Sequence, residues 1–523
     1  MLGVLLWYNT WAMTEPLQRI DLTQLTLDTP TQAVLQQLLN HIERLTAELT
    51  ELRAENQRVR DEVAQLKGEK GKPTIQANRS PAPATPPAAQ QASRSKAGAP
   101  SGPRVPRNER ITIDREHVIT LDRSRLPADV EHRGYRDVVV QNLIFTPDTV
   151  RYRLERLYAP STGRLYEAAL PEALQGQSFG SDLQAFVLLL YFELRVPEEK
   201  ILHLLQAQGL VISAGQISNI LIQKHLDRFA EERKAVLRAG LQTTSYQHID
   251  DTGARVSGVN HYFSTLCNPY YSSFFTQRHK TADTVAGLWS CLEEPAASQG
   301  SPCPVAGVEA QLSPEPRPEL AEAPKELGDY VPILISDDAP QFRHQTDHQG
   351  LCWVHEERHY KKLHPFFAVH QKLVDEFRTE IWDYYDRLKA YATAPTAALK
   401  QELSVGFDAL FSRTTGYEVL DQRIARTRQK KAELLLVLDF PEVPLENNEA
   451  ERALREYVIK RKISNGTRTP EGTEAWEVFL SLLDTCRKNG VNFYHYLRDR
   501  ISTAYQLPAL DTLVLAHARA IPG

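Results

Sequence analysis

Two aspartate pairs stand out as residues that could do chemistry. Asp250-Asp251 follows one strand-like segment, and Asp337-Asp338 follows the wholly apolar segment Val331–Ser336. Carboxylates at the ends of adjacent buried strands, joined by one acid from a helix, suit a pair of Mg²⁺ ions, which prefer oxygen ligands. Two such ions about 4 Å apart activate the attacking oxygen and stabilise the leaving oxygen of a phosphodiester. Aspartate also commonly caps helices and turns, so either pair alone is a weak indication.

A third acidic element strengthens the metal-site hypothesis. Glu451, Arg455 and Lys462 follow one another at intervals of four and seven, so one face of a helix would carry an acid and then two bases. The acid could complete a metal site while the bases meet phosphates. A solvated helix with local ion pairs also explains the alternating charge, but it does not explain Asn447-Asn448 at the entry to this helix.

These segments together resemble the insertion-sequence-66 family of bacterial transposases, which have an RNase H-like catalytic domain with a DDE triad. The resemblance covers about residues 111–505, and its motifs are matched by Asp250-Asp251-Thr252, Asp337, Cys352-Trp353-Val354-His355 with Arg358, Glu446-Asn447-Asn448-Glu449-Ala450-Glu451-Arg452 with Arg455, Arg461-Lys462, Asn489-Gly490-Val491 and Tyr496-Leu497. The Asn-Asn-x-x-Glu-Arg block is the most specific of these motifs. The sequence departs from the family at Asp251, where Glu is usual, and at Glu446, where Asp is usual.

The resemblance implies both the site and its ligands. The catalytic and metal-binding triad becomes Asp250, Asp337 and Glu451, with two Mg²⁺ ions that Mn²⁺ could replace. Asp251 and Asp338 remain rivals, because a shift of one residue along a strand turns the side chain to the other face. The resemblance further implies contact with DNA, at element ends and at the target, by Asn448, Arg452, Arg455, Arg461, Lys462, His355 and Arg358. Accessory proteins encoded by the same element are possible partners.

Residues 31–70 carry an unbroken seven-residue repeat. With Leu35 at position a, the a residues are Leu35, Ile42, Leu49, Asn56 and Val63, and the d residues are Leu38, Leu45, Leu52, Val59 and Leu66. In a parallel dimer the g and e residues that face each other have opposite charges: Glu48 with Arg53, Glu55 with Arg60, and Glu62 with Lys67. The pattern predicts a parallel coiled-coil homodimer, or a higher homo-oligomer, in which Asn56 favours two strands in register. A single amphipathic helix packed on its own protein is the alternative.

The helical stretch of residues 181–240 has the spacing of a helix-turn-helix. A helix starting near Pro197 is followed by a turn at Gly209 and by a helix that begins at a Ser213 cap. An ordinary helical hairpin fits this spacing about as well. The first interpretation predicts that residues 172–240 contact DNA.

The predicted fold is an α/β catalytic core, an RNase H-like mixed sheet with helices and a helical insertion, preceded by smaller regions. The predicted regions are an N-terminal lead (1–30), a coiled coil (31–70), a disordered basic linker (71–108), a small β-rich module (109–171), the helix-turn-helix-like region (172–240), the catalytic domain (241–505) with a low-complexity acidic insert (293–329), and a C-terminal tail (506–523). We expect the true start at Met13, because polar, periodic sequence begins there.

Composition narrows the class of protein. The 523 residues allow about three domains, and 42% hydrophobic residues suffice for sizeable cores. We expect no membrane span and no secretory signal, because no apolar run reaches the ~18 residues required and the apolar start lacks a basic region. The five cysteines have no paired spacing, which suits a reducing cytoplasm, and none precedes Cys267, so residues 109–171 hold no thiolate zinc site. The net charge of −5 conceals a basic linker and an acidic insert.

Three hypotheses about function follow. The first is a metal-dependent DNA transposase, in the bacterial cytoplasm and associated with the nucleoid, that hydrolyses strands at element ends and transfers the 3′-hydroxyl to target DNA. The second is a non-catalytic DNA-binding accessory or regulatory protein. The third is a degenerate transposase that retains the motifs without the activity. Three separated acids favour the first hypothesis, because a protein that only binds DNA has no need of them.

Overall fold

The computed structural model describes residues 28–66, 116–119, 145–170, 175–290 and 333–520. It divides the chain into two compact units, one formed by Met1–Leu52 with Thr149–Gly523 and one by Arg53–Asp148. The predictions for the basic linker and the acidic insert lie outside the described residues. None of the helices in these ranges has the length and hydrophobicity that a bilayer span needs.

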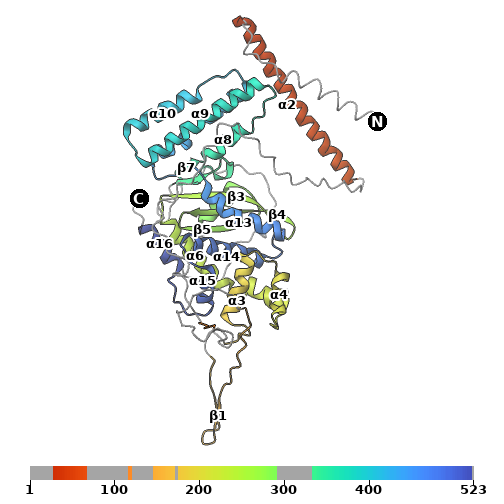
Figure 1. The fold of residues 1–523 in the computed structure, drawn as a ribbon, viewed down its shortest axis with the longest axis vertical. Helices are drawn as coiled ribbons and strands as arrows, with labels where there is room; N and C mark the ends of the chain where they lie inside the picture. Colours follow the sequence, from red (N-terminus) through yellow and green to blue (C-terminus); the bar gives the residue numbers. More distant parts are fainter. Residues whose placement is uncertain (1–27, 67–115, 120–144, 171–174, 291–332, 521–523) are drawn as a thin grey trace, which may run out of the picture. The chain divides into compact units, whose positions relative to one another are not determined.

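The centre of the larger unit is a five-stranded mixed sheet, in the order β5-β4-β3-β6-β7 (Figure 1). Its strands are β3 (Tyr246–Val256), β4 (Val259–Asn268), β5 (Tyr271–Gln277), β6 (Ile333–Ser336) and β7 (His348–Leu351). β3, β4 and β5 are antiparallel neighbours, whereas β6 runs parallel to β3 and β7 runs parallel to β6. The predicted mixed α/β class is therefore confirmed.

The course of β3 corrects one prediction. The sequence suggested that the strand ends at Ile249, but β3 continues through both aspartates, with Asp250 opposite Thr265 and Asp251 opposite Ser264 of β4. Aspartate has low strand propensity, and pairing with a long neighbouring strand outweighs that preference. Strand β7, at the edge of the sheet, was not predicted.

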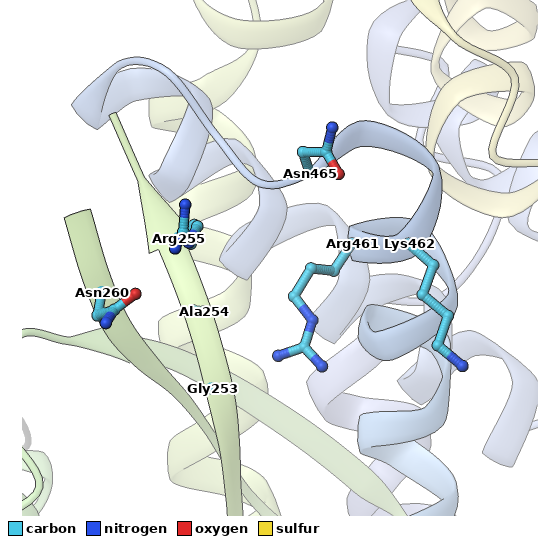
Figure 2. Close-up of a pocket in the computed structure, with 7 residues that line it drawn as sticks. All are labelled: Gly253, Ala254, Arg255, Asn260, Arg461, Lys462 and Asn465. Atoms are coloured by element: carbon cyan, nitrogen blue, oxygen red, sulfur yellow. The ribbon is translucent and has the colours of Figure 1, made fainter. Parts of the chain in front are cut away.

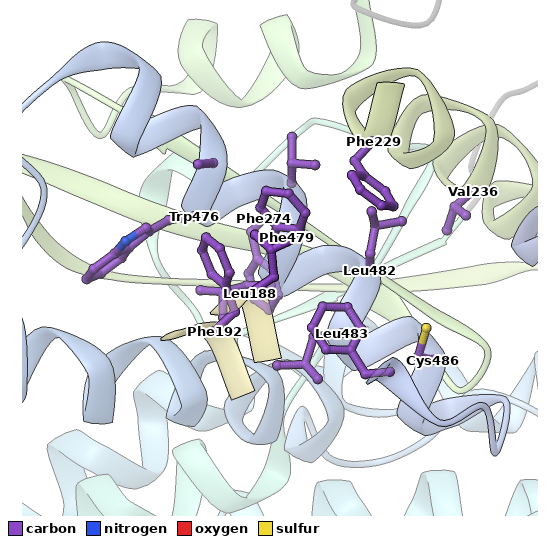
Figure 3. Packing of buried hydrophobic residues seen from close by; sticks show 14 of the residues in the cluster. Leu188, Phe192, Phe229, Val236, Phe274, Trp476, Phe479, Leu482, Leu483 and Cys486 are labelled. Carbon is purple, nitrogen blue, oxygen red and sulfur yellow. The ribbon is translucent and has the colours of Figure 1, made fainter. Parts of the chain in front are cut away.

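The helices before the sheet are α3 (Ser181–Leu188), which continues as the π-helical turn η5 (Leu189–Glu193), α4 (Glu198–Ala207), α5 (Ala214–Ile222) and α6 (Leu226–Leu241). The predicted cap of α5 is confirmed: Gln216 N–H donates to the Ser213 hydroxyl, and the Gln216 side chain accepts from Ser213 N–H. The predicted boundary at residue 240 does not separate two cores, because these helices share one hydrophobic core with the sheet. The rings of Phe192 and Phe229 lie 4.6 and 5.2 Å from the ring of Phe479. Figure 3 shows these three side chains in the core.

The segment between β7 and the last helices forms the helical insertion, with a core of its own around Trp353 and Phe407. It comprises α8 (Trp353–Lys361), α9 (Ala368–Thr393), α10 (Ala397–Phe411), α11 (Glu418–Arg428), α12 (Lys431–Leu434) and the short turn η7 (Leu436–Leu438). A helical insertion was predicted, and this segment is helical and has its own hydrophobic core.

The chain then returns to the sheet with α13 (Asn448–Ser464), α14 (Pro470–Lys488), α15 (Phe493–Ile501) and α16 (Leu510–Ala520). α13 packs on β3 and β4, and α14 runs along the edge strand β5 (Figure 1). Glu477, Ser481 and Thr485 of α14 accept hydrogen bonds from alternate backbone N–H groups of β5, which closes this edge to other strands. The predicted C-terminal tail is in fact α16, whose Leu510 and Val514 are buried.

Two elements lie toward the N-terminus. The predicted heptad helix is present as α2 (Thr29–Leu66). The only strands described within the predicted β-rich module are a two-stranded hairpin, β1 (Arg156–Ala159) and β2 (Arg164–Glu167). Residues 150–154, which alternate in sequence like a strand, have no regular structure. Their side chains are mostly exposed, so the alternating apolar residues do not pack on a buried face that would stabilise a strand.

Candidate active site

Asp250 lies in the middle of the sheet, and the strand that leads to Asp337 lies beside it. β3 and β6 pair in parallel, with His248 opposite Ile335, and Asp337 follows the last residue of β6. Asp250 and Asp337 can be neighbours only if their two strands are adjacent, and the structure shows that they are. Burial, together with the negative charges of Asp337, Asp251 and Glu451, raises the pKa of Asp250 to about 7, although the N–H of Asp251 donates to its carboxylate at 2.8 Å. The three sequence-predicted acids are therefore electrostatic neighbours.

Asn447 fixes the start of α13 on the sheet. Its side-chain N–H donates to the backbone oxygen of Ile249 at 2.8 Å, and its side-chain oxygen accepts from Nδ1 of His248 at 2.9 Å. Its backbone N–H donates to the Cys352 sulfur at 3.3 Å, and the residue is fully buried. Burial lowers the pKa of His248 to about 4, so this imidazole is neutral and can donate from Nδ1. Asn447 thus joins β3, the start of α8 and α13 at one point beside Asp250.

Glu451 stands one helical turn beyond this anchor. Its backbone N–H donates to the Asn447 oxygen at 3.2 Å, which continues the helix from the fixed point. Its carboxylate lies 3.4 Å from Arg358 and 3.4 Å from Nε2 of His355, both on α8. Burial lowers the pKa of His355 more than the charge of Glu451 raises it. Two predicted DNA-contacting residues, His355 and Arg358, therefore flank the third acid.

The rival aspartates have different surroundings. Asp251 accepts hydrogen bonds from Lys280 and from Gln341, both at 2.8 Å. Asp338 pairs with Arg343 and with Lys430, both at 2.6 Å, and these cations lower its pKa although burial acts in the opposite direction. Each rival is neutralised by a cation of the protein, whereas no ion pair is found for Asp250 or Asp337 among the described residues. This difference favours the first aspartate of each pair, a choice that strand alternation left open.

The donor set can be tested for its fit to divalent cations. No group of three or more His, Cys, Asp and Glu side chains in the described ranges converges closely enough to hold a metal ion. The donor types nevertheless fit, because Asp250, Asp337 and Glu451 offer the oxygen ligands that Mg²⁺ prefers. A bound cation would also relieve the repulsion that raises the pKa of Asp250.

A shallow basic pocket of about 400 Å³ lies where the β3–β4 hairpin meets the end of α13. Its lining includes three cations, Arg255, Arg461 and Lys462, together with Asn260 and Asn465. Figure 2 shows Arg461 extending from α13 toward β3, and a β-carbon added at Gly253 would lie 3.5 Å from its guanidinium. None of the three cations is in an ion pair with another described residue. The pocket therefore carries positive charge, the kind of surface to which phosphates are attracted.

The remaining predicted DNA-contacting residues lie on the first half of α13. Asn448 begins the helix, and the exposed Arg452 lies 3.2 Å from Glu449 in a local ion pair. Arg455 is exposed. Together with the basic pocket, these residues spread along the full length of α13.

Sequence reasoning missed several residues of the candidate site. Arg255 and Asn260 belong to a hairpin whose sequence has no motif. The role of Asn447 had one signal, the pair of asparagines at a helix entry, but its buried partners come from residues about 95 and 199 positions away. Lys280, Gln341 and Lys430 neutralise the rival aspartates, and nothing in their local sequence indicates it.

Part of the chain is similar in sequence to known proteins. Residues 321–475 match the family model described as "Transposase IS66 family". The chain is 42% identical over 193 residues to an uncharacterized protein of Sinorhizobium fredii, y4jO, a match that covers 37% of this chain and 59% of that protein. It is 28% identical over 165 residues to a second uncharacterized protein of the same organism, y4qI, covering 30% of each. The matches thus span less than two thirds of either relative.

Proposed function

We propose, from the match of residues 321–475 to the IS66 transposase family, that this chain cuts DNA phosphodiesters at the ends of an insertion sequence and joins the freed 3′-hydroxyl to target DNA. The observation that carries the proposal is the contrast among four aspartates. Asp250 and Asp337 lie near Glu451 without a neutralising cation, whereas Asp251 and Asp338 each have one. Carboxylates left without a cation inside a fold are candidates for binding one.

In the proposed mechanism, Asp250, Asp337 and Glu451 would hold two Mg²⁺ ions, or Mn²⁺ in their place. When bound, such ions activate the attacking oxygen and stabilise the leaving oxygen of a phosphodiester. Asn447 is a positioning residue, because it holds α13 at the distance from β3 that brings Glu451 near Asp250. Arg358 and His355 stand beside Glu451, where they can orient its carboxylate and contact the phosphate of a bound strand.

The basic pocket is proposed to bind the DNA backbone. Arg461 and Lys462 lie at the opposite end of α13 from Asn447, so a strand that follows the helix would pass from the acids to these cations. Contacts between cations and phosphates set the register of the duplex but carry no direct sequence information. The exposed N-terminal part of α5 and its neighbour α4 remain the candidates for recognising bases.

The wider assignments are proposals of the same kind. A central mixed sheet, in which three antiparallel strands are followed by two parallel ones, supports an RNase H-like core. We also propose a homodimer through α2, action in the bacterial cytoplasm at the nucleoid, and a possible role for accessory proteins of the same element.

The test is strand cleavage of DNA carrying the element ends, taken from the sequence that flanks the gene, in the presence of Mg²⁺. Asp250→Asn, Asp337→Asn and Glu451→Gln should each lower the rate by roughly 100-fold or more, in line with the loss of a group that stabilises transition-state charge. End binding, measured by gel shift, should persist in all three variants. Asp251→Asn is the matched control and should cleave at a rate close to that of the unaltered protein.

Three outcomes would contradict parts of this proposal. Cleavage that survives in Asp250→Asn and is lost in Asp251→Asn would show that the metal ligand is the second aspartate. Normal cleavage in all three triad variants would disprove the DDE assignment. End binding by the unaltered protein without any cleavage would favour an accessory protein or a degenerate transposase.

A further inference from the structure

Glu43 of α2 is a buried acid on a mostly exposed helix. Only 7% of it is exposed, although its neighbours along α2 are mostly exposed. Its carboxylate accepts hydrogen bonds from the backbone N–H of Phe366 at 2.8 Å and of Phe367 at 3.1 Å, and it lies 3.1 Å from Nδ1 of His370. These groups belong to the first turn of α9 and the residues before it, where helix N–H groups have no partner within the helix. Glu43 therefore caps α9 from more than 300 residues away in the chain.

Asn40 makes a similar contact one turn earlier. Its side-chain N–H donates to the backbone oxygen of Gly416 at 2.9 Å, and its side-chain oxygen accepts from the N–H of Glu418 at 3.2 Å. Glu418 is the first residue of α11, so this contact also satisfies the beginning of a helix. Gln36 packs against Gly416, whose φ of +86° requires a residue without a side chain. The helical insertion thus binds α2 at two helix N-termini.

The three contact residues lie on one face of α2. Gln36, Asn40 and Glu43 are spaced by four and three, which places them side by side on a helix. In the heptad that starts with Leu35 at a, they occupy positions b, f and b, opposite the a/d seam. Among the described residues, six apolar seam residues are exposed, by 37 to 65%: Leu38, Ile42, Leu45, Leu49, Leu52 and Val59. The contact with the insertion therefore leaves the apolar seam uncovered.

We propose that α2 is a connector with two working faces: Asn40 and Glu43 fix its b/f face to the helical insertion, and its a/d seam pairs with α2 of a second copy of this chain. The second copy is favoured as the occupant by charge, because facing g and e residues are opposite in sign at Glu48 with Arg53 and at Glu55 with Arg60. Dimerisation would then orient two catalytic domains, whereas a freely hinged zipper would only raise their local concentration.

The strength of the contact comes from charge and burial together. Burial alone would raise the pKa of Glu43, but hydrogen bonds from His370 and from the N–H groups of Phe366 and Phe367 outweigh it and lower the pKa. The carboxylate is therefore ionised at neutral pH and lies at the positive end of the α9 dipole. Without Glu43, the buried N–H of Phe367 and the part-buried N–H of Phe366 would lose their acceptor.

The first arm of the test is hydrogen exchange on the full chain. Glu43→Ala removes a charged acceptor, so the amides of Phe366 and Phe367 should exchange roughly 10- to 100-fold faster, as expected for loss of a hydrogen bond to a charged group. Asn40→Ala should accelerate exchange at Glu418 in the same way. Glu51→Ala is the matched control, because Glu51 is an exposed acid at a c position of the same helix, and it should change neither site. Unchanged exchange in Glu43→Ala would disprove the fixed contact.

The second arm is sedimentation of the same proteins. Leu45→Lys with Leu49→Lys should convert a dimer to a monomer while exchange at Phe366 and Phe367 stays slow, and Glu43→Ala should remain a dimer. A dimer that persists in the double lysine variant would show that the seam is not the interface. Neither arm uses DNA, so both remain decisive if the proposed cleavage is not found.

The third arm rests on the proposed function, because it measures the joining of two ends. Glu43→Ala should cleave single ends normally but lose concerted joining of paired ends by at least roughly tenfold, because the two domains are no longer held at a set orientation. Normal paired-end joining in a variant whose amide protection is lost would overturn the role of the connector. The absence of cleavage in the unaltered protein would count against the proposed function alone.

Discussion

Two buried carboxylates, Glu356 in the helical insertion and Asp250 in the sheet, have opposite electrostatic surroundings. Glu356 is 4% exposed and accepts hydrogen bonds from Arg423, Thr427 and, at 3.0 Å, Lys430. Burial raises its pKa, but these partners outweigh burial and the pKa is lowered. At Asp250, burial and neighbouring acids act in the same direction and raise the pKa to about 7. In the insertion, Arg423 and Lys430 neutralise the charge of Glu356. In the sheet, no cation neutralises the charge of Asp250 among the described residues.

The comparison suggests a division of labour between the two regions. Lys430 pairs with Glu356 and also with Asp338, so the ionic cluster of the insertion reaches the residue next to Asp337. A neutralised cluster can thus hold the loop after β6 in place while Asp337 itself stays available. Structural carboxylates stabilise a fold when they are paired, whereas unpaired buried ones reduce its stability and are retained for function.

The largest expected effect is a difference in stability between two variants. Glu356→Ala should lower the free energy of unfolding by about 3–5 kcal/mol, because it leaves Arg423 and Lys430 without their buried partner. Asp250→Asn should not lower it, since the substitution removes a charge that burial and Asp337 disfavour. Urea unfolding of the metal-free protein at pH 8 measures both.

The conservative variant Glu356→Gln, which keeps the shape of the side chain, separates loss of charge from loss of packing in that experiment. If Asp250→Asn destabilised the metal-free protein as strongly as Glu356→Ala, the contrast between the two regions would be wrong.

The sequence carried more local signals for the acids near the sheet than for the Glu356 cluster of the insertion. The acids near the sheet were predictable, because an apolar segment ending in Asp-Asp and a helix entry of Asn-Asn carry local signals. The continuation of β3 through Asp250 was not predictable, since it depends on pairing with Thr265 and Ser264 rather than on strand propensity. The Glu356 cluster was also missed, because Arg423 and Lys430 are about 70 residues away and become partners only when α8 and α11 pack.

The same limit applies to the two faces of α2. The a/d seam was predictable because its apolar residues repeat every seven positions within one continuous segment. The b/f contact depends on Phe366, Phe367 and Gly416, which no local pattern connects to Glu43 or Asn40. Contacts between distant segments depend on how the core packs, and periodicity describes only one helix at a time.

A smaller effect concerns acid stability. The pKa of Glu356 is lowered from 4.5 in the folded state, so its contribution to stability is present above pH 4.5 and is lost as the pH falls through the folded pKa. Glu356→Gln should therefore cost about 1.5–3 kcal/mol at pH 7, the range for hydrogen bonds to charged groups. This cost should shrink below pH 4.5. Thermal unfolding of both proteins from pH 7 to pH 3 measures the convergence, and a constant difference across that range would show that Glu356 is not held ionised.

The smallest expected effect is at Asp338, which lies between the two regions. Asp338→Asn removes ion pairs to Arg343 and to Lys430, but about half of the Arg343 side chain is exposed and Lys430 keeps its pair with Glu356. Partly exposed ion pairs of this kind contribute roughly 0–1 kcal/mol, so the midpoint of urea unfolding should shift little. Strand cleavage should fall by only a few fold, because the loop after β6 loses one of its attachments while Asp337 remains. A loss of cleavage as large as that in Asp337→Asn would instead place Asp338 among the metal ligands, and the distinction between neutralised and free acids would then fail at its closest pair.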